Sequence, residues 1–431
     1  MTSHSISCLT VAVGVAVGLA VTGCKNENYC EGNPNNDCRL HDADGPQACT
    51  GNQDCAGGQT PVCDVTGSMT CVECLPNQAD ACSGTTPACG NDHACRGCTA
   101  HAECASSDVC LPDGSCADEG TVAYVDPEGT DNSNCTNATP CTKVDKALAT
   151  TRPYVKFTGT TDAGATVVIE NQAVTLLADP QGKLTRTNNG LLLEVRGASQ
   201  VSIFDLEVGG ASGLQGIGIS MPAGNTSMLQ LTRANVSGNA GGGIFTSGGT
   251  LTVTQSTISG NAGGGVSISN AQFDLTNNLI VQNGGPASLI GGINLASVSG
   301  TGAHRLDFNT ISANAGTSTV NSGVNCGIVG AAIIFTNNII YGNTVSGGGK
   351  QVGGSTNCSA TYSNIGPDAT PGPGNINLDP LFTNAAQGNF HITPASPAKN
   401  AADPAATLAV DVDGEARPQG SARDIGADEI P

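Results

Sequence analysis

A short segment that ends in asparagine recurs five times and constrains the fold more than any other feature of the sequence. Its copies read NVSGN, TISGN, LIVQN, TISAN and IIYGN, and they end, 22, 22, 31 and 29 residues apart, at Asn239, Asn261, Asn283, Asn314 and Asn343. Columns of apolar residues lie three, eight and ten positions before these asparagines, and only His304 interrupts them. Such self-similarity is the signature of a solenoid, in which each repeat buries its apolar face against its neighbours.

The repeat length indicates what each unit of the solenoid is. Successive side chains of a strand alternate between inside and outside, so a coil of 22 residues accommodates three short strands joined by bends. A second set of asparagines lies five residues before the last three repeat ends, at Asn278, Asn309 and Asn338. Asn tolerates the left-handed backbone of a sharp bend, and stacked amides bond between coils. The sequence therefore predicts an all-β fold, a right-handed parallel β-helix solenoid of about eight coils.

The part of the chain before the solenoid has a different chemistry. Residues 30–116 contain 14 of the 20 cysteines, and 12 of these form three four-cysteine units over 49–71, 74–95 and 98–116. Few large hydrophobic residues separate them, so this module must depend on cross-links to fold. We expect a small disulfide-rich module whose pairing the sequence leaves open. Two further disulfides are expected in the solenoid, Cys135 with Cys141 and Cys326 with Cys358.

A zinc site is the alternative for part of this module. Cys71, Cys74, Cys95 and Cys98 have the spacing C-x2-C-x20-C-x2-C, which in a cytosolic protein would suggest a zinc ribbon. The N-terminal segment favours oxidation instead, because it resembles an export signal and exported proteins form disulfides.

The N-terminal segment predicts export and lipid anchoring. Leu9–Val21 is an apolar run of 13 residues, too short to span a bilayer but suited to a signal peptide. The following Val21-Thr22-Gly23-Cys24 resembles the lipobox of bacterial lipoproteins. That resemblance implies cleavage before Cys24, lipidation of Cys24 and attachment to the outer membrane or cell surface. The first seven residues depart from the usual signal peptide, since they contain no Lys or Arg.

The charge of the chain excludes one class of partner. Its formal net charge is −20, and its sequence pI is about 4.4. A surface of this sign repels the phosphate backbone, so the sequence predicts no nucleic acid as a partner.

Three further stretches resemble bacterial surface proteins. The cysteine units are similar to the short four-cysteine repeats of myxobacterial surface proteins. AYVDPEGTDNSN with KVDKALA resembles the opening of secreted β-helix proteins of the pectate lyase-like superfamily. NLDPLF, DVDGEARP and DIGADE, within 377–429, resemble the ending of choice-of-anchor Q domain proteins. These resemblances imply a signal peptide over 1–23, the cysteine module over 24–116, and a β-helix with N-terminal and C-terminal caps over 117–431. They imply fold and surface location without an established activity.

Candidate functional residues are few. The set nearest to a lyase site combines carboxylates with guanidinium groups: Glu194, Arg196, Asp205, Glu207 and Arg233. They are predicted to bind a metal or an acidic sugar if they bind anything, and cross-coil salt bridges are the alternative. Asp411 and Asp413 resemble half of a calcium loop, with pairing to Arg417 or Arg423 as the alternative. Calcium is the only cofactor that the sequence suggests, and no catalytic residue is predicted.

Two functions remain open from the sequence. The first is a non-catalytic surface lipoprotein whose β-helix contacts polysaccharide, matrix or other proteins. The second is a diverged polysaccharide lyase or glycoside hydrolase that acts on acidic polysaccharide. The first is favoured because the segments typical of polygalacturonases are missing and because a chain without Trp, with five Tyr and eight Phe, offers few rings for sugars to stack on.

Overall fold

The computed structural model describes residues 48–55, 60–76, 81–285, 288–298, 304–317, 321–329, 332–345 and 350–431. The predicted lipidation site Cys24 and the cysteines at 30 and 38 lie outside these residues. The chain divides into two units, the first comprising Cys89–Arg96 and the described residues up to Ser83, the second Gly84–Ala88 and the described residues of Gly97–Pro431. None of the helices in the described part of the chain has the length and apolar character needed to cross a membrane.

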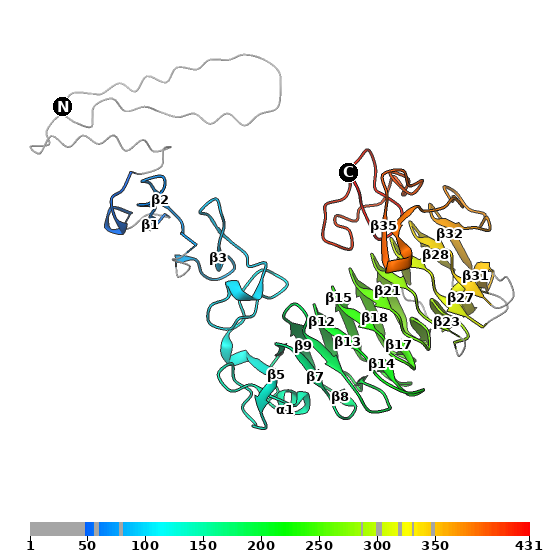
Figure 1. The fold of residues 1–431 in the computed structure, drawn as a ribbon, viewed down its shortest axis with the longest axis horizontal. Helices are drawn as coiled ribbons and strands as arrows, with labels where there is room; N and C mark the ends of the chain where they lie inside the picture. The colour runs from blue at the N-terminus through cyan, green and yellow to red at the C-terminus, as the bar shows by residue number, and fades with distance from the viewer. Residues whose placement is uncertain are drawn as a thin grey trace, which may run out of the picture. The chain divides into compact units, whose positions relative to one another are not determined.

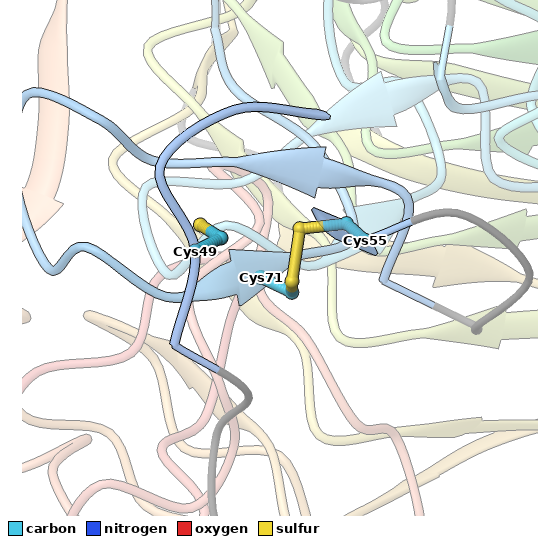
Figure 2. Close-up of side chains that lie close together, drawn as sticks. All are labelled: Cys49, Cys55 and Cys71. Carbon is cyan, nitrogen blue, oxygen red and sulfur yellow. A yellow bond between two sulfur atoms is a disulfide. The ribbon is translucent and has the colours of Figure 1, made fainter. Parts of the chain in front are cut away.

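The first unit is held together by disulfides. Within each four-cysteine unit the first cysteine bonds the third and the second bonds the fourth, giving Cys49–Cys63, Cys55–Cys71, Cys74–Cys89 and Cys82–Cys95. Figure 2 shows Cys49 beside the disulfide between Cys55 and Cys71. Its regular elements are short, namely η1 (Asn52–Cys55), β1 (Val62–Cys63), β2 (Cys71–Val72), β3 (Ala88–Cys89) and β4 (Cys95–Arg96).

The zinc alternative is wrong for these cysteines. A thiolate is needed to bind zinc. Each cysteine of the zinc-ribbon pattern is instead bonded to another cysteine of its own four-cysteine unit, Cys71 to Cys55, Cys74 to Cys89, Cys95 to Cys82 and Cys98 to Cys110.

The second unit contains the predicted parallel β-helix, formed by three parallel sheets (Figure 1). The eight-stranded sheet comprises β8 (Val167–Glu170), β11 (Leu193–Arg196), β14 (Ile217–Met221), β17 (Gly242–Thr246), β20 (Val266–Ser269), β23 (Ile293–Val298), β27 (Asn321–Val329) and β31 (Lys350–Gly354). The nine-stranded sheet comprises β7 (Thr160–Asp162), β10 (Lys183–Thr185), β13 (Glu207–Gly209), β16 (Asn235–Ser237), β19 (Thr257–Ser259), β22 (Leu279–Val281), β25 (Thr310–Ser312), β29 (Ile339–Tyr341) and β33 (Asn364–Gly366). The ten-stranded sheet comprises β5 (Val122–Thr130), β6 (Tyr154–Phe157), β9 (Ala173–Ala178), β12 (Gln200–Phe204), β15 (Met228–Thr232), β18 (Thr250–Thr254), β21 (Gln272–Thr276), β24 (Arg305–Asp307), β28 (Ile333–Thr336) and β32 (Cys358–Thr361).

The apolar columns of the sequence form the core. Ile258 pairs in register with Val236 on one side and Ile280 on the other, and all three are buried. The prediction of an all-β solenoid is therefore confirmed, and the eight-stranded sheet agrees with the expected number of coils. At the N-terminal end, α1 (Val144–Ala149) packs Val144 and Leu148 into the same core.

Two ladders of buried asparagine run along the interior. In the first, each side-chain amide donates to the side-chain oxygen of the next coil at 2.8–3.0 Å, through Asn239, Asn261, Asn283, Asn314 and Asn343. The second ladder joins Asn278, Asn309 and Asn338 at 2.9 and 3.0 Å. The sequence also predicts a left-handed backbone at the asparagines of this second ladder. The structure gives that conformation to the residues just before them, with φ of 64° at Asn277, 55° at Phe308 and 59° at Asn337.

The third four-cysteine unit lies in the same compact unit as the β-helix. This segment contains η3 (His101–Glu103), its disulfides are Cys98–Cys110 and Cys104–Cys116, and η4 (Glu119–Thr121) follows it. Val109 packs in a buried cluster with Leu177 and Phe204, which project from the outer face of the ten-stranded sheet. The fully buried Lys156 joins the two parts, since its Nζ lies 2.8 Å from Asp179 and 3.6 Å from Asp108.

The C-terminal segment runs back along the bends of the β-helix in addition to following its last strands (Figure 1). It contains β34 (Phe382–Asn384), η5 (Ala385–Gln387) and β35 (Asn389–Ile392), while β26 (Ala315–Gly316) and β30 (Thr344–Val345) form a small separate sheet. Gln255 donates to the Asp411 carbonyl at 3.0 Å, and Asn277 donates to the Val410 carbonyl at 3.1 Å. The bend residue Phe308 packs in a buried cluster with Ile392. The segment therefore covers one long edge of the solenoid.

The two disulfides expected outside the cysteine module are present. Cys135 bonds Cys141 beside the N-terminal strand, and Cys326 bonds Cys358 from β27 to β32. Cys326 belongs to the buried core and the partly buried Cys358 packs against it, so this bond ties successive coils together at the core.

Candidate functional site

The five charged candidate residues do not form one cluster. Glu194 and Arg196 point outward from β11 of the eight-stranded sheet. The Arg196 guanidinium lies 2.9 Å from Glu170, one coil earlier, and 3.6 Å from Glu194. The hydrogen bond and the charge of Glu170 raise the pKa of Arg196. This pair of carboxylates therefore shares one guanidinium cation.

Asp205 and Arg233 lie at bends between the ten-stranded and nine-stranded sheets. Both residues have a left-handed backbone, with φ of 57° and 51°. Arg233 donates to both carboxylate oxygens of Asp205, at 2.8 and 2.7 Å, across one coil. The hydrogen bond to Asp205 raises the pKa of Arg233 although burial opposes it.

Glu207 follows on β13 in the nine-stranded sheet, on a third side of the solenoid. Its carboxylate lies 2.7 Å from Lys183 and accepts a hydrogen bond from Ser237 at 2.8 Å. Sequence reasoning missed Lys183 and Glu170 as partners. The signal that could have found them is the coil register, which aligns Lys183 with Glu207 and Glu170 with Arg196.

The pairing limits what these residues can do chemically. Each carboxylate of the candidate set faces a cation, and the groups lie on the eight-stranded sheet, on the nine-stranded sheet and at bends between the ten-stranded and nine-stranded sheets. A calcium ion requires several oxygen ligands that converge on one point, and a general base must stand clear of a counter-ion. The described members of this set provide neither arrangement.

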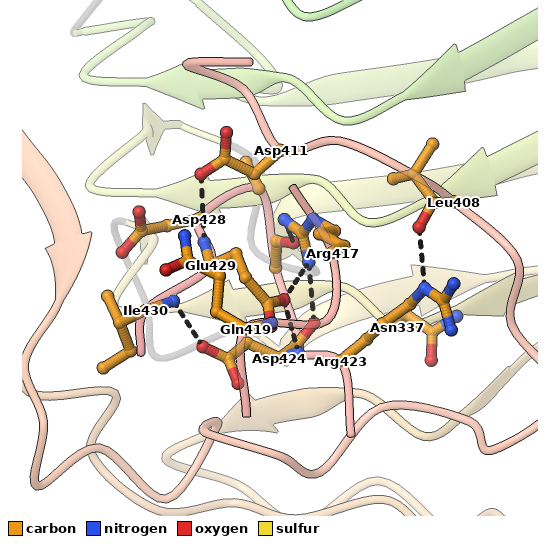
Figure 3. Close-up of polar contacts among 12 residues, drawn as sticks. Asn337, Leu408, Asp411, Arg417, Gln419, Arg423, Asp424, Asp428, Glu429 and Ile430 are labelled. Atoms are coloured by element: carbon orange, nitrogen blue, oxygen red, sulfur yellow. Dashed lines mark hydrogen bonds and ion pairs between the residues drawn. The ribbon is translucent and has the colours of Figure 1, made fainter. Parts of the chain in front are cut away.

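A denser polar cluster lies in the C-terminal segment (Figure 3). The Arg417 guanidinium is fully buried, and its Nη1 lies 3.3 Å from Glu429 and donates to the Asp424 carbonyl at 3.0 Å. Its other terminal nitrogen donates to the Gly426 carbonyl, and the group stacks 4.9 Å above the Phe308 ring. The buried cation therefore joins the C-terminal segment to the bend of the β-helix at Phe308.

Asp411 organises the loop beside this cluster. The side chain is fully buried, and its two oxygens accept hydrogen bonds from the backbone amides of Asp413, Glu415 and Glu429. Burial raises the pKa of Asp411 although these amides oppose the change. The expected pairing of Asp411 or Asp413 with Arg417 or Arg423 is wrong. Arg417 pairs with Glu429, and the Nε of Arg423 donates to the Leu408 carbonyl at 2.6 Å.

Asp413 lies in a small group with His391 and Asp428. The His391 Nε2 is 2.7 Å from an Asp413 oxygen, and the ligand atoms of all three side chains lie within 4.8 Å of one another. Burial opposes a charge on the imidazole, but the hydrogen bond to Asp413 and the charges of the nearby aspartates raise the pKa of His391. Asp428 is already engaged by the Ile392 amide at 2.7 Å. Calcium binding by Asp411 and Asp413 stays a prediction.

No protein-family model matches this chain, and no curated protein matches it. Among solved structures it is similar to the crystal structure of pectate lyase Pel9A, with 15% identity and a TM-score of 0.44, over 72% of this chain and 96% of that chain. This identity is too low to carry an activity from one protein to the other.

Proposed function

We propose that this protein is a non-catalytic scaffold, exported and lipid-anchored at the cell surface, whose β-helix presents flat polar faces to a polysaccharide or matrix partner. One observation carries the proposal. The charged residues that a lyase-like site would use are distributed over three sides of the solenoid and are neutralised by ion pairs with Glu170, Lys183 and one another.

The interior supports a role that requires rigidity. Two asparagine ladders, an internal disulfide and a C-terminal segment that covers one edge all restrict movement between coils. A solenoid with this interior can present side chains at fixed intervals along an extended surface.

The alternative function is a diverged lyase or hydrolase of acidic polysaccharide, and turnover separates the two. Purified protein is incubated with polygalacturonate and alginate, with calcium and with a chelator, and new reducing ends and unsaturated products are measured. We expect no product above the protein-free control. Product formation that Glu194→Gln or Arg196→Lys abolishes would refute the scaffold proposal and favour the enzyme.

The lipid anchor is tested separately, because it depends on residues outside the described part of the chain. Cys24→Ala removes the thiol that would carry the lipid. We expect wild-type protein to partition into the detergent phase of a phase-separation assay and the variant to stay in the aqueous phase. Equal partitioning of the two proteins would exclude the anchor and leave the scaffold proposal intact.

A further inference from the structure

The outer face of the eight-stranded sheet changes character along the solenoid. One outward column passes in register through Glu194, Ser220, Phe245, Ser267 and Asn294 and continues to the next coil. Its first coils carry the paired charges described above, and the later coils carry a phenyl ring, a hydroxyl and amides. The described part of the column therefore passes from a charged end to an uncharged end.

The uncharged end lies in a groove. Two depressions of about 240 and 710 Å³ share the lining residues Leu289, Ile290 and Asn294, so they form one continuous groove over the later strands of this sheet. The loop that contains Leu289 forms one wall, and this side chain is 73% exposed. None of the residues lining either depression carries a charge.

The floor of this groove is built by the repeat. Gly264 has a φ of 111°, and a Cβ there would lie 2.6 Å from the Ile290 carbonyl oxygen, so glycine lets the loop that contains Leu289 and Ile290 pack closely against the floor. Amides are aligned along the floor one coil apart. Asn325 donates to the side-chain oxygen of Asn294 at 2.8 Å, and Asn294 donates to the Ser267 hydroxyl at 3.4 Å. Phe245 continues this row in register at its other end.

We infer that this groove binds an extended neutral polysaccharide, an inference that rests on the proposed scaffold function and names its ligand class. Amides and hydroxyls both donate and accept, as sugar hydroxyls do, and they recur at the strand spacing of about 4.8 Å, so one chain of sugars can contact successive coils. Phe245 offers one ring for stacking. The residues that line the groove therefore suit neutral sugars, and they include none of the ion-paired residues of the earlier coils.

Charge excludes an acidic polymer from the same groove. A uronate or sulfate group needs a cation in contact, and no lining residue supplies one. The chain also has a net charge of −20, which repels polyanions at longer range. A peptide is disfavoured for a different reason. Extended peptides add to an unpaired strand edge, and β20, β23 and β27, which supply most of this floor, are already paired on both sides.

Affinity gel electrophoresis of the full exported protein tests the inference. Native gels contain hydroxyethyl cellulose, galactomannan or dextran as neutral polymers, or polygalacturonate as the acidic polymer. We expect at least one neutral polymer to retard the protein and polygalacturonate to have no effect. The double variant Asn294→Ala with Asn325→Ala, and separately Phe245→Ala, should weaken binding about tenfold.

A matched control uses outward polar residues on another face. Gln230 and Thr252 lie on the outer side of β15 and β18, so Gln230→Ala with Thr252→Ala should leave binding unchanged. The thermal midpoint of every variant is measured to show that it folds. Failure of all three neutral polymers, binding of polygalacturonate, or unchanged binding by the folded groove variants would each overturn the inference.

The same mixtures separate this inference from the proposed function. Reducing ends are assayed after electrophoresis. Cleavage of a polymer that the groove variants no longer bind would refute the non-catalytic scaffold and support the groove. Absence of both binding and cleavage would refute the groove and leave the scaffold proposal standing.

Discussion

At the residue scale, His304 is the side chain that fits its surroundings least well. It occupies an apolar column and stacks on Phe273 with ring centroids 5.0 Å apart. Both ring nitrogens are buried without a hydrogen-bond partner among the described residues. Burial lowers the pKa of His304 from 6.5, so the folded state resists its protonation. An interior position of this kind favours an apolar ring over an imidazole.

Replacing this ring is therefore expected to stabilise the protein. His304→Phe removes two unpaired polar atoms and should raise the free energy of unfolding by about 1–2 kcal/mol at pH 7. The advantage should grow as the pH falls below 6.5, because only the unfolded wild type gains a proton readily. Urea unfolding of both proteins at pH 5 and 7 measures this, and a variant less stable than wild type at both values would contradict it.

The contribution of Asp424 to stability changes with pH in the opposite direction from that of His304. Burial raises its pKa to about 6, against an ordinary value of 3.8, although the amides of Asn400 and Ile430 oppose the shift. The folded protein therefore holds this proton more tightly than the unfolded chain, and stability from this group is lost as the pH rises from about 4 to about 6. The loss is on the order of 3 kcal/mol.

Asp424→Asn abolishes this titration and isolates its contribution. The unfolding free energy of wild type minus that of the variant should decrease as the pH rises from 4 to 7. Chemical unfolding at each pH supplies the difference. Curves that stay parallel over this range would show that the ionisation of Asp424 is not linked to folding.

At the scale of elements, the asparagine ladders hold one coil to the next. The Asn283 side chain donates to Asn314 and to the Ile258 carbonyl and accepts from Asn261. Asn283→Ala leaves several of these buried groups unpaired and should cost about 3 kcal/mol of stability. Asn294→Ala is the matched control, because this outward amide is half-buried, and it should cost less than about 1 kcal/mol. Equal losses in urea unfolding would mean that the interior ladder has no special role.

One buried cation, Lys156, adds to the apolar contact between the third four-cysteine unit and the ten-stranded sheet. Asp179→Asn removes the closer of the two carboxylates at Lys156 and should destabilise the protein by about 2 kcal/mol, because the buried ammonium loses its main partner. Lys156→Met should cost less, since the apolar stem is retained and both aspartates can reach water. Thermal unfolding compares the two, and a larger loss for Lys156→Met would contradict this order.

At the scale of the whole molecule, the two units are stabilised by different means. The buried cluster of the first four-cysteine unit consists of Cys49, Cys55, Cys63 and Cys71, whereas the β-helix buries a long apolar core. Reduction should therefore unfold residues 48–96 and leave the β-helix folded. Limited proteolysis with mass spectrometry, before and after treatment with a phosphine reductant, should show new cleavage in the first unit and continued protection beyond residue 116. Loss of the far-ultraviolet β signal on reduction would contradict this expectation.

Part of the architecture was predictable because it repeats in the sequence. The column of Val236, Ile258 and Ile280 recurs at one residue per coil, so the solenoid and its inward residues follow from spacing alone. The asparagine positions also followed, because amides that recur once per coil at the same position lie above one another and can bond to their copies in the next coil. Disulfide connectivity did not follow, since four cysteines in a short loop-rich unit permit three pairings and only the folded loops select one.

Functional residues were less predictable than the fold. Glu194, Asp205 and Glu207 are close in sequence, yet a solenoid turns a sharp corner every few residues and places them on different sides. The partners of Asp205 and Glu207 come from neighbouring coils, 20 to 30 residues away, where the coil register identifies them.

The sequence by itself determined the repeat, the inward columns and the cysteine-dependent first unit, because those features depend on residue type at regular intervals. Tertiary structure alone decided that Arg417 pairs with Glu429, that the third four-cysteine unit joins the β-helix, and that an uncharged groove lies over the later coils. Each of these contacts joins segments that do not follow one common sequence repeat. The contacts therefore form only after the chain has folded into coils and its ends have packed against them.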